Sequence, residues 1–103
     1  MRVMVQFWFP AEPGNDIVRT GKVGQVFQRI TDELKPEAAY FFPNAGERSG
    51  LFVINMQDSS EVAQVAERFF HGLNARIDMT PVMNAEDIQK ALSHVETIVK
   101  NYG

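Results

Sequence analysis

The chain begins with a stretch that is almost wholly apolar, from Arg2 to Phe9. Successive side chains of a β-strand point to opposite faces, so a strand over these residues would present two separate rows. One row consists of Val3, Val5, Phe7 and Phe9, and the other of Met4, Gln6 and Trp8. Because both rows are apolar except for Gln6, we predict a strand that is covered on both faces.

A second apolar run, Leu51 to Met56, is followed by apolar residues at helical spacing. We therefore predict a strand that leads directly into a helix. Asp58 is the expected N-cap of this helix, and Glu61 is placed to complete a capping box. Gly72 is the expected C′ residue that ends the helix. The apolar stripe of this helix consists of Val62, Val65, Ala66, Phe69 and Leu73.

Another helix is predicted between these two runs. It is expected to begin at Asn15 or Asp16 and to break near Gly21, because glycine disfavours a helix interior. It should end before Pro36, since the residue that precedes a proline avoids the helical region. The apolar stripe of this helix consists of Val23, Val26, Phe27, Ile30 and Leu34.

Two further strands and a last helix complete the pattern. Glu37 to Pro43 is predicted as a strand that forms an antiparallel hairpin with the run at Leu51, through a turn and loop over residues 44–49. Asn74 to Val82 alternates as a strand, and Asn84 with Asp87 is predicted to cap the final helix. The apolar side of that helix consists of Ile88, Ala91, Leu92, Val95, Ile98 and Val99.

The order strand-helix-strand-strand-helix-strand-helix indicates an α+β fold of the ferredoxin-like βαββαβ type with an additional C-terminal helix. The expected sheet is four-stranded and antiparallel, with strands one and three central and the helices on one side. At 103 residues the chain is expected to form a single domain over residues 1–103.

One face of this sheet would then lack helices. We expect Val3, Val5 and Phe7 to face the helices, together with Phe52, Ile54 and Met56. The open face would carry Met4, Gln6, Trp8, Tyr40, Leu51, Val53, Asn55, Arg76, Asp78 and Thr80. This assignment holds for strands two and three only if neither contains a bulge. An apolar patch on central strands marks an interface, and a second copy is its simplest cover, so we predict a homodimer through the open face.

The whole chain resembles the dimeric α+β barrel superfamily, which includes muconolactone isomerase-like and antibiotic-biosynthesis-monooxygenase-like proteins. More closely, it is similar to small uncharacterised bacterial proteins of that superfamily. The similar segments are MVQFWFP, LKPEAAYFFP, GLFVINMQDSSEV and FFHGLNARIDMTPVMNAEDIQKA. The resemblance implies a dimeric α+β barrel, and it contains no catalytic signature.

Composition excludes several classes of function. A net charge of −3 argues against nucleic-acid binding, which depends on neutralising phosphates with basic residues. The chain has no cysteine, and its histidines, His71 and His94, lie in different predicted helices without a cluster of ligands. We therefore expect no metal and no cofactor. No segment is long and apolar enough for a membrane span, so the expected location is the cytoplasm.

The open face carries the candidate chemistry. Arg76, Asp78 and Thr80 would point into the space between two sheets, near Gln6 and Asn55, where they could orient a small carboxylate or carbonyl compound. Asp78 is the candidate proton acceptor. The favoured alternative is that Arg76 and Asp78 form an ion pair at the dimer rim or lie in water. Trp8 and Tyr40 could stack on an aromatic ligand, although such residues serve more often as interface anchors.

Three hypotheses on function follow from this pattern. The first is a homodimer that binds a small metabolite between its sheets, and that could be a cofactor-independent isomerase-like or monooxygenase-like enzyme on a carboxylated or aromatic compound. The second is a non-catalytic structural or regulatory dimer. The third is a subunit whose open sheet face binds a different protein. The pattern leaves open whether the chain is an enzyme.

Overall fold

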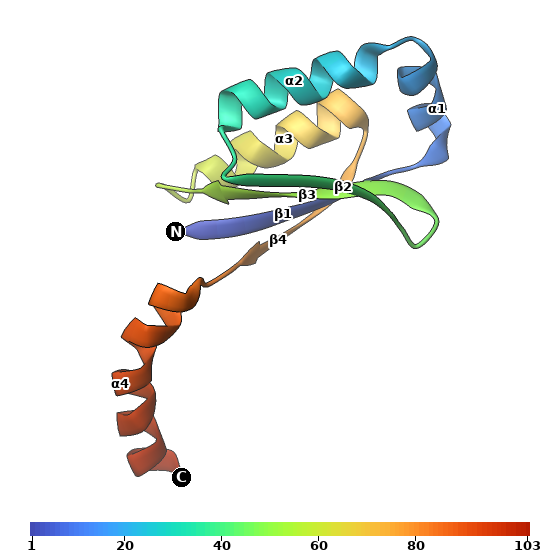
Figure 1. Cartoon of the computed structure of the whole chain (residues 1–103). Helices are drawn as coiled ribbons and strands as arrows, with labels where there is room; N and C mark the ends of the chain where they lie inside the picture. The colour runs from blue at the N-terminus through green and yellow to red at the C-terminus, as the bar shows by residue number, and fades with distance from the viewer.

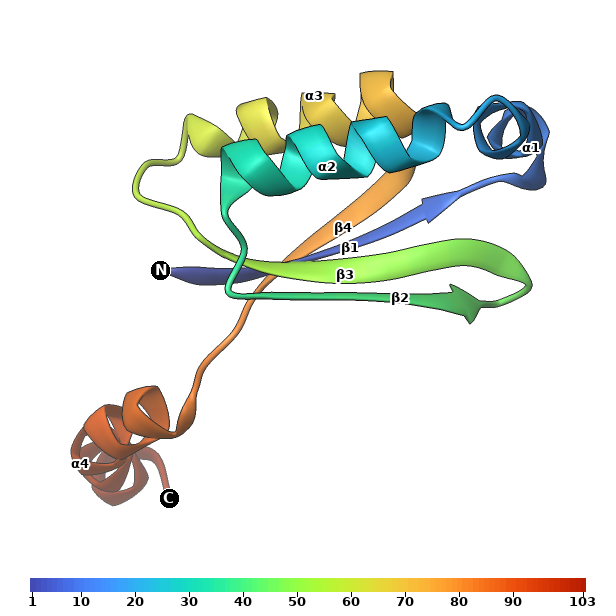
Figure 2. The same ribbon diagram turned by 45° about the horizontal axis from the view of Figure 1, so that its top comes forward.

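The computed structural model describes residues 1–103, apart from the side chain of Pro13. Helices α2 and α3 cover one face of a single sheet, and α4 leads away from it on the other side (Figures 1 and 2). In chain order the elements are β1 (Arg2–Phe9), α1 (Ala11–Arg19), α2 (Lys22–Leu34), β2 (Ala38–Asn44), β3 (Glu47–Asn55), α3 (Glu61–Leu73), β4 (Arg76–Pro81) and α4 (Ala85–Tyr102).

The sheet has four antiparallel strands in the order β2-β3-β1-β4. Val5 on β1 lies opposite Phe52 on β3 and Met79 on β4, so apolar side chains from three strands share one face. This arrangement confirms the predicted α+β fold with a ferredoxin-like order of elements and a C-terminal helix. β1 and β3 are central, as the ferredoxin-like order of elements predicts.

The core lies between the sheet and helices α2 and α3. Phe7, Phe52 and Phe69 are fully buried, and the ring of Phe7 lies 5.7 Å from that of Phe52 and 5.1 Å from that of Phe69. Helix α2 contributes Ile30, which is buried, and Phe27, whose ring lies 5.5 Å from that of Phe7. Burial of these large rings supplies the main driving force for folding of this layer.

The hairpin between β2 and β3 differs from the prediction. Residues 47–49 belong to β3 and not to a loop, because Asn44 and Glu47 are paired across a turn of only Ala45 and Gly46. Both turn residues have positive φ, 53° and 78°. Such a turn has a backbone twist that matches the twist of the paired strands, so pairing continues up to it. The predicted antiparallel pairing is confirmed, with a longer β3.

The first helical region also differs at its start. Helix α1 begins at Ala11 after Pro10, so Asn15 and Asp16 lie inside the helix and do not cap it. The predicted break near Gly21 is confirmed, since this residue separates α1 from α2 with a φ of 76°. Helix α2 ends at Leu34, before the residue that precedes Pro36, as predicted.

Helix α3 ends at Leu73, later than the predicted end at Gly72. Gly72 lies inside the helix, and Asn74 is the left-handed residue that ends it. A Cβ atom on Gly72 would lie 2.8 Å from Cγ1 of Val26, so this glycine permits the close approach of α2 and α3. At the other end the N-cap is Ser60, whereas Asp58 was predicted. The carboxylate of Glu61 accepts the N–H of Asp58 at 2.8 Å, which is one half of the predicted capping box.

Helix α4 starts as predicted and then departs from the rest of the fold. Asn84 Oδ1 accepts the N–H of Asp87 at 2.9 Å, and Asp87 Oδ2 accepts the N–H of Asn84 at 3.0 Å, which completes a capping box. No residue of the helix is buried. Within the part of the chain that the structure describes, no helix is long and apolar enough to cross a membrane.

Candidate functional site

The face of the sheet opposite α2 and α3 gathers the side chains that the alternation predicted for it. Gln6 lies between Leu51 on β3 and Asp78 on β4, and the next row along the strands has Met4 between Val53 and Thr80. Strand period and register therefore confirm the predicted face assignment. The residues on this open face include Met4, Gln6, Trp8, Tyr40, Leu51, Val53, Asn55, Arg76, Asp78 and Thr80.

Polar groups on central strand β1 and edge strand β4 lie side by side on this open face. The amide of Gln6 is half-buried on the central strand β1, and the carboxyl group of Asp78 is exposed on its neighbour β4. The half-buried apolar side chains of Met4, Leu51 and Val53 lie next to Gln6 on the side away from β4 or along β1. An amide can both donate and accept, and a carboxylate accepts. Together they can orient a small molecule that carries a hydroxyl, carbonyl or amide group.

A cation lies over the indole of Trp8. The guanidinium carbon of Arg76 is 4.7 Å from the ring centroid, which is within cation–π range. Arg76 Nη2 also lies 3.7 Å from Glu47 Oε2 on β3, so the guanidinium spans the width of β1. Arg76 therefore forms its ion pair with Glu47. The alternative interpretation of the sequence had expected Asp78 as the partner. The arrangement offers a positive charge beside an aromatic surface.

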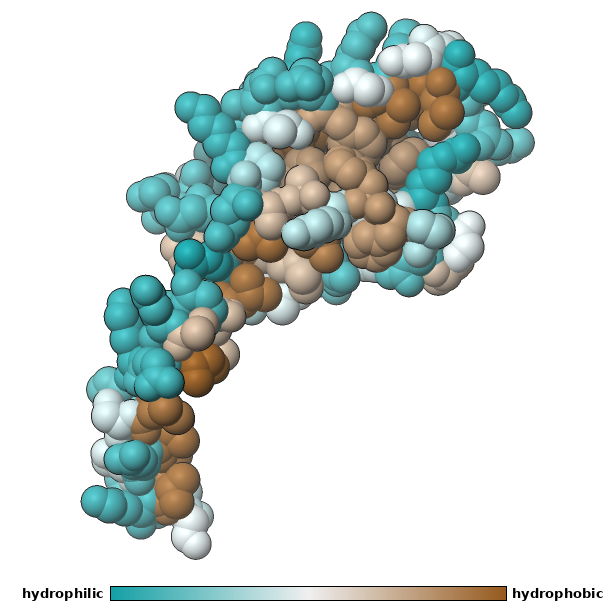
Figure 3. Space-filling model, viewed as in Figure 1, coloured by the Kyte–Doolittle hydropathy of each residue, from teal (hydrophilic) through white to brown (hydrophobic). Residues whose placement is uncertain are grey.

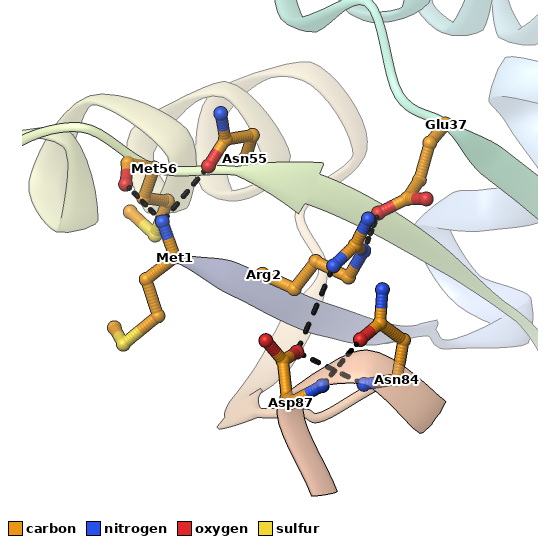
Figure 4. Close-up of polar contacts among 7 residues, drawn as sticks. All are labelled: Met1, Arg2, Glu37, Asn55, Met56, Asn84 and Asp87. Carbon is orange, nitrogen blue, oxygen red and sulfur yellow. Dashed lines mark hydrogen bonds and ion pairs between the residues drawn. The ribbon is translucent and has the colours of Figure 1, made fainter. Parts of the chain in front are cut away.

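Two of the predicted site residues lie apart from this group. Tyr40 shares a row with Leu51, Gln6 and Asp78, but it is on edge strand β2, three strand spacings or roughly 14 Å from β4. Asn55 is at the end of β3, and its Oδ1 accepts a hydrogen bond from the N-terminal ammonium group at 2.9 Å (Figure 4). Structure thus brings together Gln6, Trp8, Arg76, Asp78 and Thr80, and separates Tyr40 and Asn55 from them.

A cavity that sequence reasoning missed lies on the helix side, at the end of the β2–β3 hairpin. Its volume is about 600 Å³, which is within the range of small-molecule sites. The rings of Phe9, Phe27 and Phe41 line it, and Arg48 contributes a charged group. The strand alternation could have indicated it, because Arg48 shares the face of Phe52, but residues 47–49 were expected to form a loop.

Metal-binding groupings are absent from the described residues: no three or more His, Cys, Asp and Glu side chains are placed to hold an ion. His71 Nε2 lies 2.9 Å from Glu67 Oε2 one turn earlier on α3, and both side chains are exposed. This pair is on the solvent side of α3, away from the open face of the sheet.

Comparison with known proteins identifies a family without an assigned activity. A formyltetrahydrofolate deformylase from Pseudomonas putida KT2440 is similar in structure to 80% of this chain, with a TM-score of 0.49 and 14% sequence identity. The chain spans only 29% of that protein. No curated protein matches the sequence. Residues 1–96 match the family described as a domain of unknown function, DUF3303. The chain therefore belongs to the DUF3303 family.

Proposed function

We propose that the chain is a homodimer whose two open sheet faces pack together as an α+β barrel and enclose a site for a small metabolite. The observation that carries this proposal is the half-buried amide of Gln6 on central strand β1, which lies beside Asp78 on edge strand β4 and next to an apolar patch of the same face. These polar groups can form hydrogen bonds to a ligand once a second surface encloses both them and the ligand. Unassisted burial of an unpaired polar group costs about 1–3 kcal/mol.

Energetics favour a cover for this face. The side chains of Met4, Trp8, Leu51 and Val53 are only half-buried in a single chain. At about 1.5–3 kcal/mol for full burial of one large apolar side chain, completing the burial of four contributes roughly 3–6 kcal/mol per chain. A second copy supplies the same patch by symmetry, and paired sheets at about 10 Å leave room for side chains of both. Trp8 and Tyr40 would then act as anchors of the interface.

The expected ligand is a small carboxylated or aromatic compound. Arg76 would bind its carboxylate while the indole of Trp8 contacts a planar group, as their 4.7 Å stacking supports. Asp78, the catalytic candidate, would accept a proton from a ligand that Gln6 and Thr80 orient. This set would suit a cofactor-independent isomerase-like or monooxygenase-like reaction. A dimer without a ligand, with a structural or regulatory role, is the alternative.

Sedimentation equilibrium of the full chain over a concentration series tests the dimer. The wild-type chain is expected to have the mass of a dimer. Val53→Lys puts a charge in the middle of the open face and should raise the dissociation constant by at least about 100-fold. Gln64→Lys, on the exposed side of α3, is the matched control and should leave it unchanged. A wild-type chain that stays monomeric would refute the proposal.

A panel of aromatic and short aliphatic carboxylates, screened by thermal shift, tests the ligand site. Arg76→Ala and Asp78→Ala should each abolish the shift while the mass of the dimer is retained. Arg19→Ala, an exposed arginine on α1, is the control for the lost charge. Binding that survives both open-face variants would show that the ligand binds elsewhere.

The hairpin cavity is a second candidate for that other site. It is formed by one chain, has a volume of about 600 Å³, and combines aromatic rings with Arg48. Binding of a planar carboxylate in this cavity would be abolished by Arg48→Ala and retained in Arg76→Ala. The affinity of this site for the carboxylate would not depend on dimer formation. The two arginine variants therefore distinguish the two sites.

A further inference from the structure

Helix α4 carries a row of apolar side chains that its own chain does not cover. The exposed fraction of its large aliphatic side chains ranges from 43% for Ile88 to 59% for Val99, and that of Tyr102 is 88%. The row, which we call the α4 stripe, consists of Ile88, Leu92, Val95, Ile98, Val99 and Tyr102. Helices in water take most of their stability from packing of such a face, so the stripe needs a partner surface.

Helix α4 has an ion pair with the sheet where the helix starts. Arg2 Nη1 lies 3.7 Å from Asp87 Oδ2, and the same guanidinium binds Glu37, which immediately precedes β2 (Figure 4). Asp87 is also bound to Asn84 in the capping box. The ion pair thus joins the first turn of α4 to β1, while the capping box fixes the turn itself. The helix leaves on the side of the open face, away from α2 and α3 (Figure 1).

The α4 stripe borders the same space as the open face. In Figure 3 the apolar side of α4 is turned toward the region below the sheet, where a second sheet would lie in the face-to-face dimer. Strand β2 is at the other edge of the sheet from β4, so α4 and β2 of one chain start from opposite edges. β2 has no charged residue, and its Tyr40, on the open face, is 63% exposed. An apolar edge strand of this kind invites pairing unless something covers it.

We propose that α4 is an arm that crosses to a second copy of this chain and packs its stripe along the β2 edge of that copy. This inference rests on the face-to-face dimer of the proposed function. A two-fold axis parallel to the strands puts the β4 edge of one copy over the β2 edge of the other. The arm that follows β4 then meets Tyr40, which lies on the open face of β2. An axis perpendicular to the strands would instead stack β4 on β4 and leave both apolar edges bare.

The area of the stripe matches the requirement of a stable dimer. Taking about 50 Å² for each half-exposed aliphatic side chain and about 150 Å² for Tyr102, one arm offers about 400 Å². Two arms and the surfaces that receive them would bury about 1,600 Å², the usual size of a specific interface. The stripe and β2 between Ala38 and Pro43 also lack charged residues, which is typical of an interface centre.

Two charge variants of the full chain test the arm by sedimentation equilibrium. Leu92→Lys with Val95→Lys should raise the dissociation constant of the dimer at least about 100-fold. Ser93→Lys with Thr97→Lys adds the same charge to the polar side of α4 and is expected to change it less than about threefold. Lysine favours helix, so both variants keep α4. A dimer that Val53→Lys dissociates and the stripe variant leaves intact would refute the arm while upholding the face-to-face dimer.

Disulfide trapping locates the surface that receives the arm, since the chain has no native cysteine. A mixture of Leu92→Cys chains and Tyr40→Cys chains, oxidised together, should yield a disulfide between the two variants, because Tyr40 is exposed on the open face of β2. Thr97→Cys in place of Leu92→Cys should not. A disulfide between two Leu92→Cys chains in preference would mean that the two arms pair with each other. An intramolecular disulfide in a chain that carries both cysteines would mean that α4 folds back onto β2 of its own chain. Either result would overturn the proposal.

Discussion

Replacement of Gly50 with alanine tests the register on which the candidate site depends. Gly50 on β3 lies opposite Phe7 on β1 and is buried. A Cβ atom at this position would lie 2.6 Å from Cζ of Phe7 and 2.6 Å from the carbonyl oxygen of Tyr40 on β2. The carbonyl is held by strand pairing, so the Phe7 ring must move. That ring is fully buried among Phe27, Phe52 and Phe69.

The expected cost follows from these contacts. Adding a methyl group to a well-packed core costs about 1–3 kcal/mol. Moving Phe7 out of its preferred ring contacts adds roughly 0.5–1.5 kcal/mol. Loss of glycine's freedom in the unfolded chain returns about 0.4–1 kcal/mol. We expect Gly50→Ala to lower the free energy of unfolding by about 2–3 kcal/mol, a large part of the 5–15 kcal/mol that is usual for a domain.

Urea denaturation at a fixed protein concentration measures this change, with the single tryptophan, Trp8, as the fluorescent probe. Gly24→Ala is the matched control. It lies in α2 with no atom within 4 Å of the added methyl group, and it should raise stability by up to about 1 kcal/mol. If Gly50→Ala proved no less stable than Gly24→Ala, then Phe7 would not lie opposite Gly50. The open-face rows of β1 and β3 would then be assigned wrongly.

Three further substitutions test local features. Asn84→Ala removes the capping box of α4 and should cost about 1 kcal/mol, seen as a loss of helical circular dichroism on mild heating that Asn84→Asp does not show. Gly72→Ala places a methyl group 2.8 Å from Val26 and should cost about 1–3 kcal/mol in urea denaturation, a cost that Val26→Ala would largely remove; an additive double variant would contradict this packing. The hydroxyl of Ser60 donates to the carboxylate of Asp58 at 2.9 Å and lowers the pKa of that group. Ser60→Ala should therefore raise the pKa of Asp58, measured by NMR titration of the carboxyl carbon. Because the folded-state pKa is the lower one, the stabilisation from this group is present above the unfolded-state pKa and is lost as the pH falls through the folded-state pKa.

Strand alternation and local capping were accessible from the amino-acid sequence, because they depend on neighbours along the chain. The rows of β1, with Phe7 on one face and Trp8 on the other, follow from a period of two residues. The Asn84 capping box needs only a side chain and an amide three residues apart. The open face and its polar residues, including Asp78, could be predicted for the same reason, and so could the fold class.

Contacts between distant segments could not be read in this way. Arg76 pairs with Glu47 because β1 separates β4 from β3 by only one strand, and the sequence pattern had suggested Asp78. Gly72 is required by Val26 on another helix, although its position in the sequence resembles a helix end. The hairpin cavity exists only because β3 continues to Glu47 and turns Arg48 toward the helices. The ion pair at the start of α4 joins Arg2 and Asp87, which are far apart in the chain and meet only in the folded structure.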